Sequence, residues 1–151
     1  MADGPARLFD AAGTPIVARI ELVEASGPVA PRHSYRTKVV VEASPTIAPR
    51  IVRDHRDASG EHHDERALDR DAYEELFAEV LASLPLGESR DLAAPLRNRK
   101  GVSFNHVAVS LGDASSRLDY VLSQIDEDET SSDPHARTVV DALKRAARAA
   151  S

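Results

Sequence analysis

Three histidines fall within nine residues of the sequence, among five acidic side chains. They are His55, His62 and His63, and the acids around them are Asp54, Asp57, Glu61, Asp64 and Glu65. Imidazole and carboxylate groups are common ligands of zinc and similar divalent ions. A metal-dependent enzyme or sensor built on these histidines is therefore one hypothesis. The helical pattern of two histidines with a glutamate between them is absent, however. A solvated polar loop accounts for the same residues, and we expect no metal and no cofactor.

His106 is the other residue that could act as a general base. It lies in the apolar run 102–111, where the alternation of a strand places it on one face with Phe104 and Ala108. The sequence contains neither a serine nucleophile elbow nor a glycine-rich phosphate loop. Asp119 and Tyr120 could form an acid and base pair with Asp126, Asp128 and Glu129 only if the fold brings them together, and an exposed acidic loop accounts for the same residues. These residues therefore predict a protein that is not an enzyme.

Acidic residues are concentrated in two segments of the chain. Residues 54–75 contain nine acids and three Arg, and residues 126–133 contain five acids and no base. An acidic surface steers a partner protein that carries a basic surface, because complementary charge raises the association rate and selects the partner. The residues expected to contact such a partner are Asp126, Glu127, Asp128, Glu129, Asp54, Asp64 and Glu65.

The overall composition disfavours several other classes of protein. The net charge of −6 argues against binding to the nucleic-acid backbone, and three Phe, three Tyr and no Trp offer little stacking surface for bases. No apolar run reaches the roughly 18 residues of a membrane span, and the first residues lack the pattern of a signal peptide. The chain has no cysteine, which excludes disulfides and thiolate metal sites. We expect a cytoplasmic protein that contacts neither nucleic acid nor membrane.

Alternating apolar and polar residues predict the strands. Residues 16–22 and 35–42 alternate with a period of two and are separated by turn residues, which predicts an antiparallel hairpin. A third and more polar stretch from 50 to 57, returning through 62–66, is either an exposed edge of the sheet or a disordered loop. Residues 102–111 and 117–125 predict a second hairpin around the Gly112–Ser116 turn.

Two segments have the periodicity of amphipathic helices. The first begins at Asp69 or Asp71, where a carboxylate can accept hydrogen bonds from first-turn amides, and ends before Pro85. The second begins at Pro134 after Asp133, and its carboxyl end is basic. The resulting order ββ(β)αββα predicts an α+β fold, an antiparallel sheet with two helices packed on one face. With 151 residues the chain suits one such domain over residues 15–151, preceded by a flexible or short-strand segment over residues 1–14.

The second half of the chain resembles a known family. The amphipathic helix at 73–81, the Val102-Ser-Phe strand, the Gly112-Asp turn, the Leu118-Asp-Tyr strand, the acidic stretch 126–129 and the terminal helix containing 139–143 follow one another as in YezG-type immunity proteins of polymorphic toxin systems. This resemblance covers residues 73–148. It implies a nonenzymatic cytosolic protein that neutralises a cognate bacterial toxin by binding it.

The sequence therefore supports three hypotheses of different kinds. The first is a protein-binding module, an immunity or inhibitor-type protein that neutralises another protein through its acidic surface. The second is a structural or assembly subunit that forms a homo-oligomer or docks on a larger complex. The third is the metal-dependent enzyme or sensor based on His55, His62 and His63.

Overall fold

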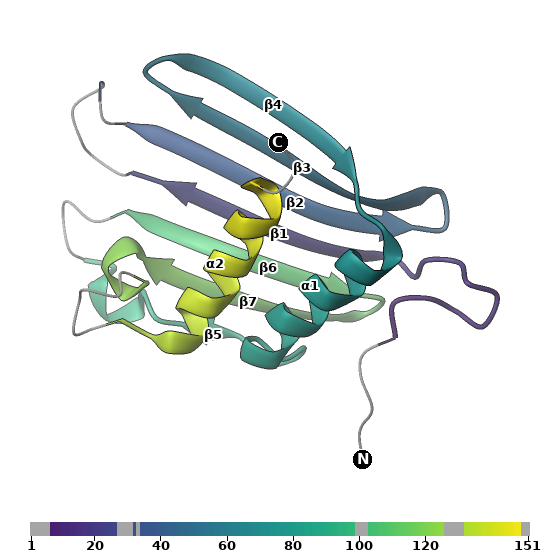
Figure 1. Ribbon diagram of the computed structural model, residues 1–151. Helices are drawn as coiled ribbons and strands as arrows, with labels where there is room; N and C mark the ends of the chain where they lie inside the picture. Colours follow the sequence, from purple (N-terminus) through teal and green to yellow (C-terminus); the bar gives the residue numbers. More distant parts are fainter. Residues whose placement is uncertain (1–6, 27–31, 33, 99–102, 126–131, 149–151) are drawn as a thin grey trace.

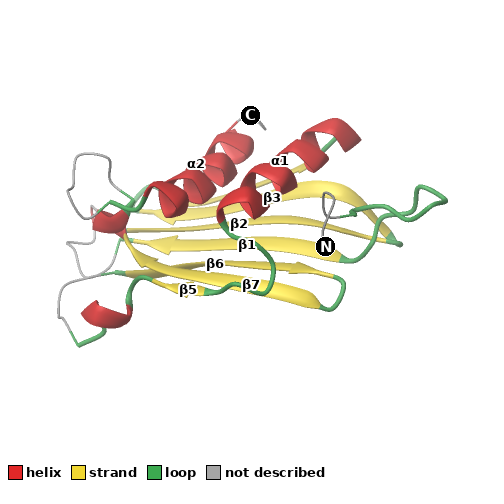
Figure 2. Cartoon of the chain, turned by 90° about the horizontal axis from the view of Figure 1, so that it is seen from below, coloured by secondary structure: helices red, strands yellow, loops and turns green. Residues whose placement is uncertain are grey.

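The computed structural model of the chain is a two-layer α+β structure in which one sheet carries two helices on a single face (Figures 1 and 2). It describes residues 7–26, 32, 34–98, 103–125 and 132–148. The seven strands follow one another across the sheet in the order β4-β3-β2-β1-β6-β7-β5. The predicted fold class and the placement of both helices on one face are confirmed.

The two halves of the chain meet in the middle of the sheet. β1 pairs antiparallel with β2 on one side and with β6 on the other. β5 differs from the other strands because it runs parallel to its neighbour β7. The strands are β1 (Ala18–Ala25), β2 (Tyr35–Ser44), β3 (Ile47–Asp57), β4 (Gly60–Ala67), β5 (Arg90–Asp91), β6 (Phe104–Leu111) and β7 (Ala114–Val121).

Alternation along each strand divides the sheet into two faces. Ile20 and Leu22 on β1 are fully buried, whereas Arg19 between Ala18 and Ile20 is exposed. Across the sheet, Leu22 lies opposite Val39 on β2 and Val107 on β6, so the apolar rows coincide. These rows form one core cluster with residues of both helices. We call this side of the sheet the helix face and the opposite side the open face.

The first helix, α1 (Arg70–Ser83), begins where the carboxylate predicted to cap it lies. Asp69 accepts a hydrogen bond of 2.7 Å from the Ala72 amide, which satisfies one of the unpaired first-turn donors. Tyr73, Phe77 and Val80 are buried against the helix face. The chain leaves the helix through Gly87, whose φ of 83° favours glycine.

The second helix, α2 (Pro134–Arg148), begins after Asp133, as predicted. The Asp133 carboxylate accepts a 3.0 Å hydrogen bond from the Ala136 amide and forms a 2.6 Å ion pair with Arg90. Val139 and Leu143 are fully buried, and α2 packs beside α1 across the sheet (Figure 2). Asp133 therefore holds the start of α2 to the segment that contains β5.

Three expectations from the sequence need correction or completion. The polar connector after α1 contains β5, which the sequence did not predict. The last predicted strand ends at Val121 instead of Ile125, because residues 122–124 form a single 3₁₀ turn. The polar third stretch and its return are an ordered hairpin of two strands, β3 and β4, at the edge of the sheet.

The described part of the amino-terminal segment packs on the core. Leu8 and Phe9 are buried, and Phe9 forms an isolated bridge with Pro15. Among the described residues, no helix combines the length and the hydropathy that a transmembrane segment needs.

Candidate functional site

The two edges of the sheet differ. The outer side of β7 is covered by the connector after α1: the Gly87 amide donates to the Ser115 carbonyl, the Leu92 amide donates to the Asp119 carbonyl, and the Arg117 amide donates to the Ser89 hydroxyl. At the opposite edge, no strand in the described part of the chain pairs with the outer side of β4 (Figure 1). All residues of β4 except Arg66 are exposed. The sheet therefore ends in the two-residue strand β5 on one side and in the eight-residue strand β4 on the other, and we call the outer side of β4 the free edge.

The free edge presents the backbone groups of alternate residues. The Leu68 amide donates to the Pro49 carbonyl, which places this pair among the hydrogen-bonded pairs of the β3–β4 ladder. Because such pairs alternate along antiparallel strands, even-numbered residues of β4 bond to β3, whereas Glu61, His63 and Glu65 direct their N–H and C=O groups outward. The side chains of these three residues lie on the open face.

The hairpin carries three of the seven predicted partner-binding acids, but on two faces. Asp54 and Glu65 point to the open face, whereas Asp64 lies opposite Arg53 on the helix face. Each has a basic neighbour: Asp54 pairs with His63, Glu65 with Arg50 at 2.7 Å, and Asp64 with Arg53 at 3.8 Å. The other four acids, at positions 126–129, lie outside the described residues. The hairpin acids therefore sit within ion pairs and do not form one uniform negative patch.

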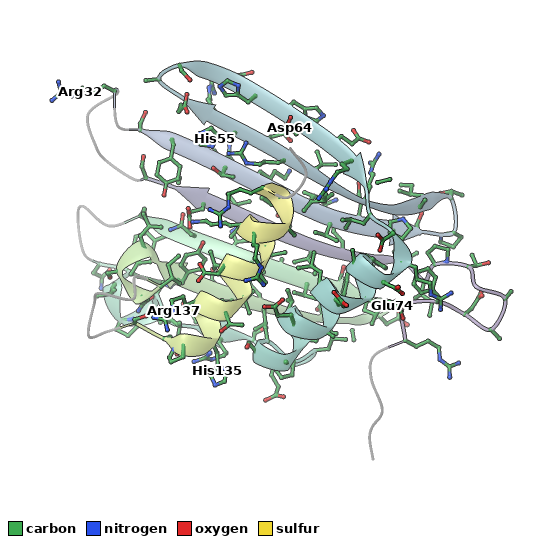
Figure 3. The ribbon with its side chains drawn as sticks, in the orientation of Figure 1. Arg32, His55, Asp64, Glu74, His135 and Arg137 are labelled. Carbon is green, nitrogen blue, oxygen red and sulfur yellow. The ribbon has the colours of Figure 1, made fainter. Side chains whose placement is uncertain are left out.

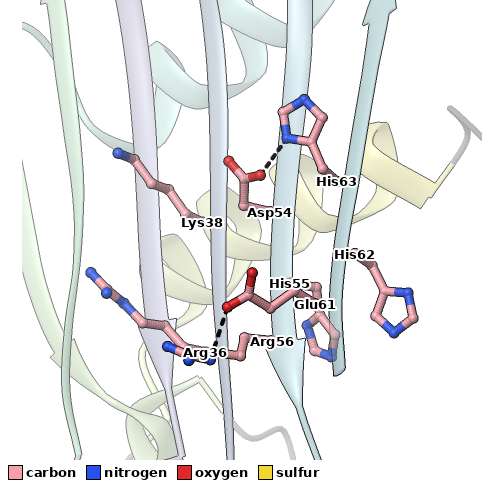
Figure 4. Close-up of a pocket in the computed structure, with 8 residues that line it drawn as sticks. All are labelled: Arg36, Lys38, Asp54, His55, Arg56, Glu61, His62 and His63. Atoms are coloured by element: carbon pink, nitrogen blue, oxygen red, sulfur yellow. Dashed lines mark hydrogen bonds and ion pairs between the residues drawn. The ribbon is translucent and has the colours of Figure 1, made fainter. Parts of the chain in front are cut away.

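The open face of the hairpin is hollowed by a shallow cavity of about 530 Å³ (Figure 4). Asp54 and Lys38 line it from neighbouring strands, and the His63 imidazole points toward the Asp54 carboxylate. The Asp54 carboxylate, which bonds and attracts the His63 imidazole, raises the pKa of His63 above its ordinary value. Arg36 lies directly opposite Arg56 across the ladder, and Arg56 pairs with Glu61 at 3.3 Å. Positive and negative groups therefore alternate over this surface.

The three clustered histidines do not converge. His55 and His62 lie opposite each other on the helix face with ring centroids 6.3 Å apart, whereas His63 projects from the open face. Within the described ranges, no three His, Asp or Glu side chains are grouped so that they could hold a metal ion. His106 also projects from the open face, with its Nε2 3.4 Å from a Glu21 carboxylate oxygen.

His55 instead belongs to a chain of hydrogen bonds on the helix face. Its Nδ1 lies 2.7 Å from the Thr37 hydroxyl and its Nε2 lies 2.9 Å from the Asp57 carboxylate. Hydrogen bonds from the Ser59 hydroxyl and amide, together with that to His55, lower the pKa of Asp57 to about 2. An ionised Asp57 can only accept, so His55 Nε2 donates to it, and in the tautomer with its only proton on Nε2 the Nδ1 accepts a hydrogen bond from the Thr37 hydroxyl. The Tyr35 ring stacks on the imidazole at 6.2 Å.

A buried carboxylate lies next to this chain of hydrogen bonds. Glu24 on β1 is 2% exposed, and its carboxylate accepts hydrogen bonds of 3.1 Å from the hydroxyls of Tyr35 and Tyr120. The Lys144 ammonium, from α2, lies 2.7 Å from the same carboxylate. Burial and the neighbouring negative charge raise the pKa of Tyr35 to about 12 and also raise that of Tyr120. Both phenols therefore remain hydrogen-bond donors at neutral pH.

Sequence reasoning missed this group, although a signal was present. Glu24 has the same parity as Ile20 and Leu22, so the alternation of β1 places it on the buried face. A carboxylate at a core position requires paired and hydrogen-bonded neighbours. Tyr35, Tyr120 and Lys144 come from three other elements, and only the fold brings them together.

No protein-family model, no curated protein and no solved structure matches the chain. The resemblance of residues 73–148 to YezG-type immunity proteins therefore stays a prediction.

Proposed function

We propose that this protein is a nonenzymatic protein-binding module that captures a basic segment of a partner protein by adding it as a strand beside β4. The observation that carries the proposal is the free edge: seven of the eight residues of β4 are exposed, and its alternate residues Glu61, His63 and Glu65 direct backbone groups away from β3, with no described strand pairing with them. In strand addition, main-chain hydrogen bonds supply affinity and the side chains of alternate residues supply specificity.

The side chains of β4 select the partner. Charged residues on an edge strand prevent pairing with strands that lack complementary charge. Glu61 and Glu65 lie four residues apart on the open face, and Asp64 lies between them on the helix face. A partner strand with Lys or Arg opposite these positions would form cross-strand pairs of opposite charge. The partner expected from this edge is therefore basic.

The same side chains disfavour pairing between two copies of β4. In an antiparallel pair that extends the sheet, each face continues into the same face of the other copy. If the two His63 residues lie opposite each other, Glu61 of each copy lies opposite Glu65 of the other copy. If instead the two strands pair about Asp64, the Asp64 residues of the two copies lie directly opposite each other. Like charges directly opposite each other destabilise a sheet. The edge is thus better suited to a different protein than to a homo-oligomer.

We infer that binding neutralises the partner, as expected of an immunity or inhibitor-type protein. The resemblance of the second half of the chain to YezG-type immunity proteins supports this role, and an acidic segment at positions 126–129 would add a second contact to a basic partner. None of the described strands has to move for a segment to pair with the outer side of β4.

The experiment first identifies the partner and then tests the edge. A photo-crosslinking residue at position 61, introduced into the full chain in its native host, should form a covalent adduct that mass spectrometry identifies. The purified partner is then titrated with the wild type and with His63→Pro, which removes an outward N–H but leaves the β3–β4 ladder intact. His63→Ala controls for loss of the His63–Asp54 pair, and Glu75→Lys on the exposed side of α1 controls for net charge.

Strand addition predicts that His63→Pro weakens binding at least tenfold relative to His63→Ala, because the proline removes a main-chain hydrogen bond in a specific interface. Glu61→Lys with Glu65→Lys should also weaken it, chiefly through a slower association rate. Equal affinities of the proline and alanine variants would exclude β4 as the binding edge. A combined reversal at Asp126, Glu127, Asp128 and Glu129 tests the predicted second contact separately.

A further inference from the structure

We propose that the partner strand that adds to β4 carries an aromatic residue directly opposite His62. This aromatic residue would add to the basic pattern of that strand, so it depends on the proposed strand addition. His62 lies on the helix face of the edge, whereas Glu61 and Glu65 lie on the open face. The two faces of β4 would therefore recognise different kinds of side chain in the same partner.

Three rings form a row on the helix face that runs outward to the free edge. The Tyr35 ring on β2 stacks on the His55 imidazole on β3, with the two planes 23° apart. The His55 and His62 rings lie 6.3 Å apart, with their planes at 30° (both are labelled in Figure 4). His62 ends the row, because β4 is the last strand on this side of the sheet. An added strand would place one of its own residues at the next position of the row.

The outer side of the His62 ring is open to such a residue. His62 is exposed, and its neighbour on the same face towards the turn is Gly60, which has no side chain. The Ser59 hydroxyl oxygen lies 3.4 Å from His62 Nε2, on the side of the turn. His55 covers the inner side of the ring, and no described strand lies on its outer side.

The hydrogen-bonding pattern of β4 brings a partner side chain close to His62. The main-chain groups of His62 bond to those of His55, so His62 forms a non-hydrogen-bonded pair with a new antiparallel strand. In such pairs the Cα atoms are about 4.5 Å apart and the side chains lie closer than in hydrogen-bonded pairs. Facing aromatic rings stabilise a sheet more than their buried area alone would. A ring is therefore the side chain that gains most at this position.

The acids of β4 place the aromatic residue within a defined sequence pattern. In an antiparallel partner, the residue after the aromatic one lies opposite Glu61, and the residues two and three before it lie opposite Asp64 and Glu65. Basic residues at these three positions form cross-strand pairs of opposite charge. The expected partner segment contains two basic residues, one variable residue, the aromatic residue and one basic residue, in that order. A parallel partner has the reverse order.

The experiment titrates the full-length protein with synthetic peptides that are as long as β4. The first peptide has lysine at its third, fourth and seventh positions, tyrosine at its sixth position and threonine elsewhere. A second peptide has isoleucine in place of the tyrosine, and both are also made in reversed order to test a parallel partner. Binding is followed by the amide NMR signals of Glu61, His63 and Glu65, whose N–H groups face outward.

The tyrosine peptide should bind about fivefold more tightly than the isoleucine peptide in at least one direction, because a ring pair is worth more than an apolar contact of similar size. His62→Ala should abolish this difference, and His62→Phe should retain it. His135→Ala is the matched control, since His135 is an exposed histidine on α2, away from β4 (Figure 3), and should change neither affinity.

The possible failures separate this inference from strand addition itself. Equal affinities of the tyrosine and isoleucine peptides, with shifts of the outward amides, would exclude the aromatic pair but leave strand addition at β4 in place. A tyrosine preference that persists in His62→Ala would also exclude it. If no peptide shifts these amides in either direction, both the aromatic pair and the proposed edge are rejected. The wild-type titrations decide the first and last of these outcomes even if a variant does not fold.

Discussion

The Lys144 ammonium on α2 lies 2.7 Å from the Glu24 carboxylate on β1, and this pair joins the carboxyl end of the last helix to the middle of the sheet. Glu24 is almost completely buried, whereas the Lys144 side chain keeps 31% of its surface exposed. The energetic cost of burial therefore falls mainly on the carboxylate.

Removing Lys144 should destabilise the protein, and the loss should depend on whether Glu24 is still charged. Lys144→Met leaves Glu24 buried without its counter-charge and should lower the free energy of unfolding by about 3 kcal/mol. The double variant Lys144→Met with Glu24→Gln should lose less than the sum of the two single variants. Urea denaturation of all four proteins gives the coupling energy. Additive effects would show that the two charges do not interact.

Two buried tyrosines should respond in opposite directions to loss of their hydroxyl groups. Tyr120 donates to the Glu24 carboxylate, so Tyr120→Phe should lower stability by about 2 kcal/mol. The Tyr73 hydroxyl is buried and has no hydrogen-bond partner within the described residues, so Tyr73→Phe should raise stability by about 1 kcal/mol. Thermal or urea unfolding measures both. A loss of stability in Tyr73→Phe equal to that in Tyr120→Phe would contradict this assignment.

Asp133 should contribute to stability in two separable ways. Asp133→Asn retains a side-chain oxygen for the Ala136 amide but removes the ion pair with Arg90. Asp133→Ala removes both interactions and should cost about 1 kcal/mol more than the asparagine variant, the usual value of an N-cap. Comparison of the two variants by urea unfolding isolates the cap, and equal stabilities would rule out a capping role.

The pair between His63 and Asp54 should stabilise the hairpin in a pH-dependent way. The folded-state pKa of His63 lies above its ordinary value of 6.5 because the Asp54 carboxylate favours the imidazolium. The contribution is therefore fully present below pH 6.5 and is lost as the pH rises through the folded-state pKa. The stability difference between wild type and His63→Ala should shrink over that range, and more salt should reduce it because the pair is exposed.

Asp54→Asn supplies the control for this pH dependence. In that background His63 has lost its main partner, so His63→Ala should change stability by a similar small amount at every pH. A pH-dependent effect as large as that of the wild type, persisting without Asp54, would assign the stabilisation to the other acidic neighbour of His63, Glu65 at 3.8 Å.

The parts of the fold that depend on side-chain periodicity could be predicted from the sequence. Ile20 and Leu22 repeat with the period of a strand, Tyr73, Phe77 and Val80 repeat with the period of a helix, and the structure has those elements there. β5 could not be predicted in this way, because Arg90 and Asp91 carry no apolar pattern. Its pairing arises from main-chain hydrogen bonds to β7, which any residue except proline can form.

The candidate sites were harder to predict because they depend on neighbours that are remote in sequence. The acids of residues 54–65 look like a negative patch along the chain, but the hairpin sets each beside a base: Asp54 beside His63, Asp64 beside Arg53, and Glu65 beside Arg50. Conversely, the sequence alone suggests that Glu24 is a surface charge. In the structure it is buried and accepts a hydrogen bond from the hydroxyl of Tyr120, which is 96 residues away in the sequence. Register and packing, and not composition, determine both outcomes.

The covered outer side of β7 limits what can be built from this molecule. Because the connector bonds to Ser115, Arg117 and Asp119, no further strand can pair with β7, and the last described strand on that side is the two-residue β5. Among the described strands, β4 is therefore the one edge strand long enough to accept a partner strand over several residues. The complex should therefore stop at one partner per copy with a fixed stoichiometry, and the protein can present an open β-edge without the hazard of polymerising into fibres.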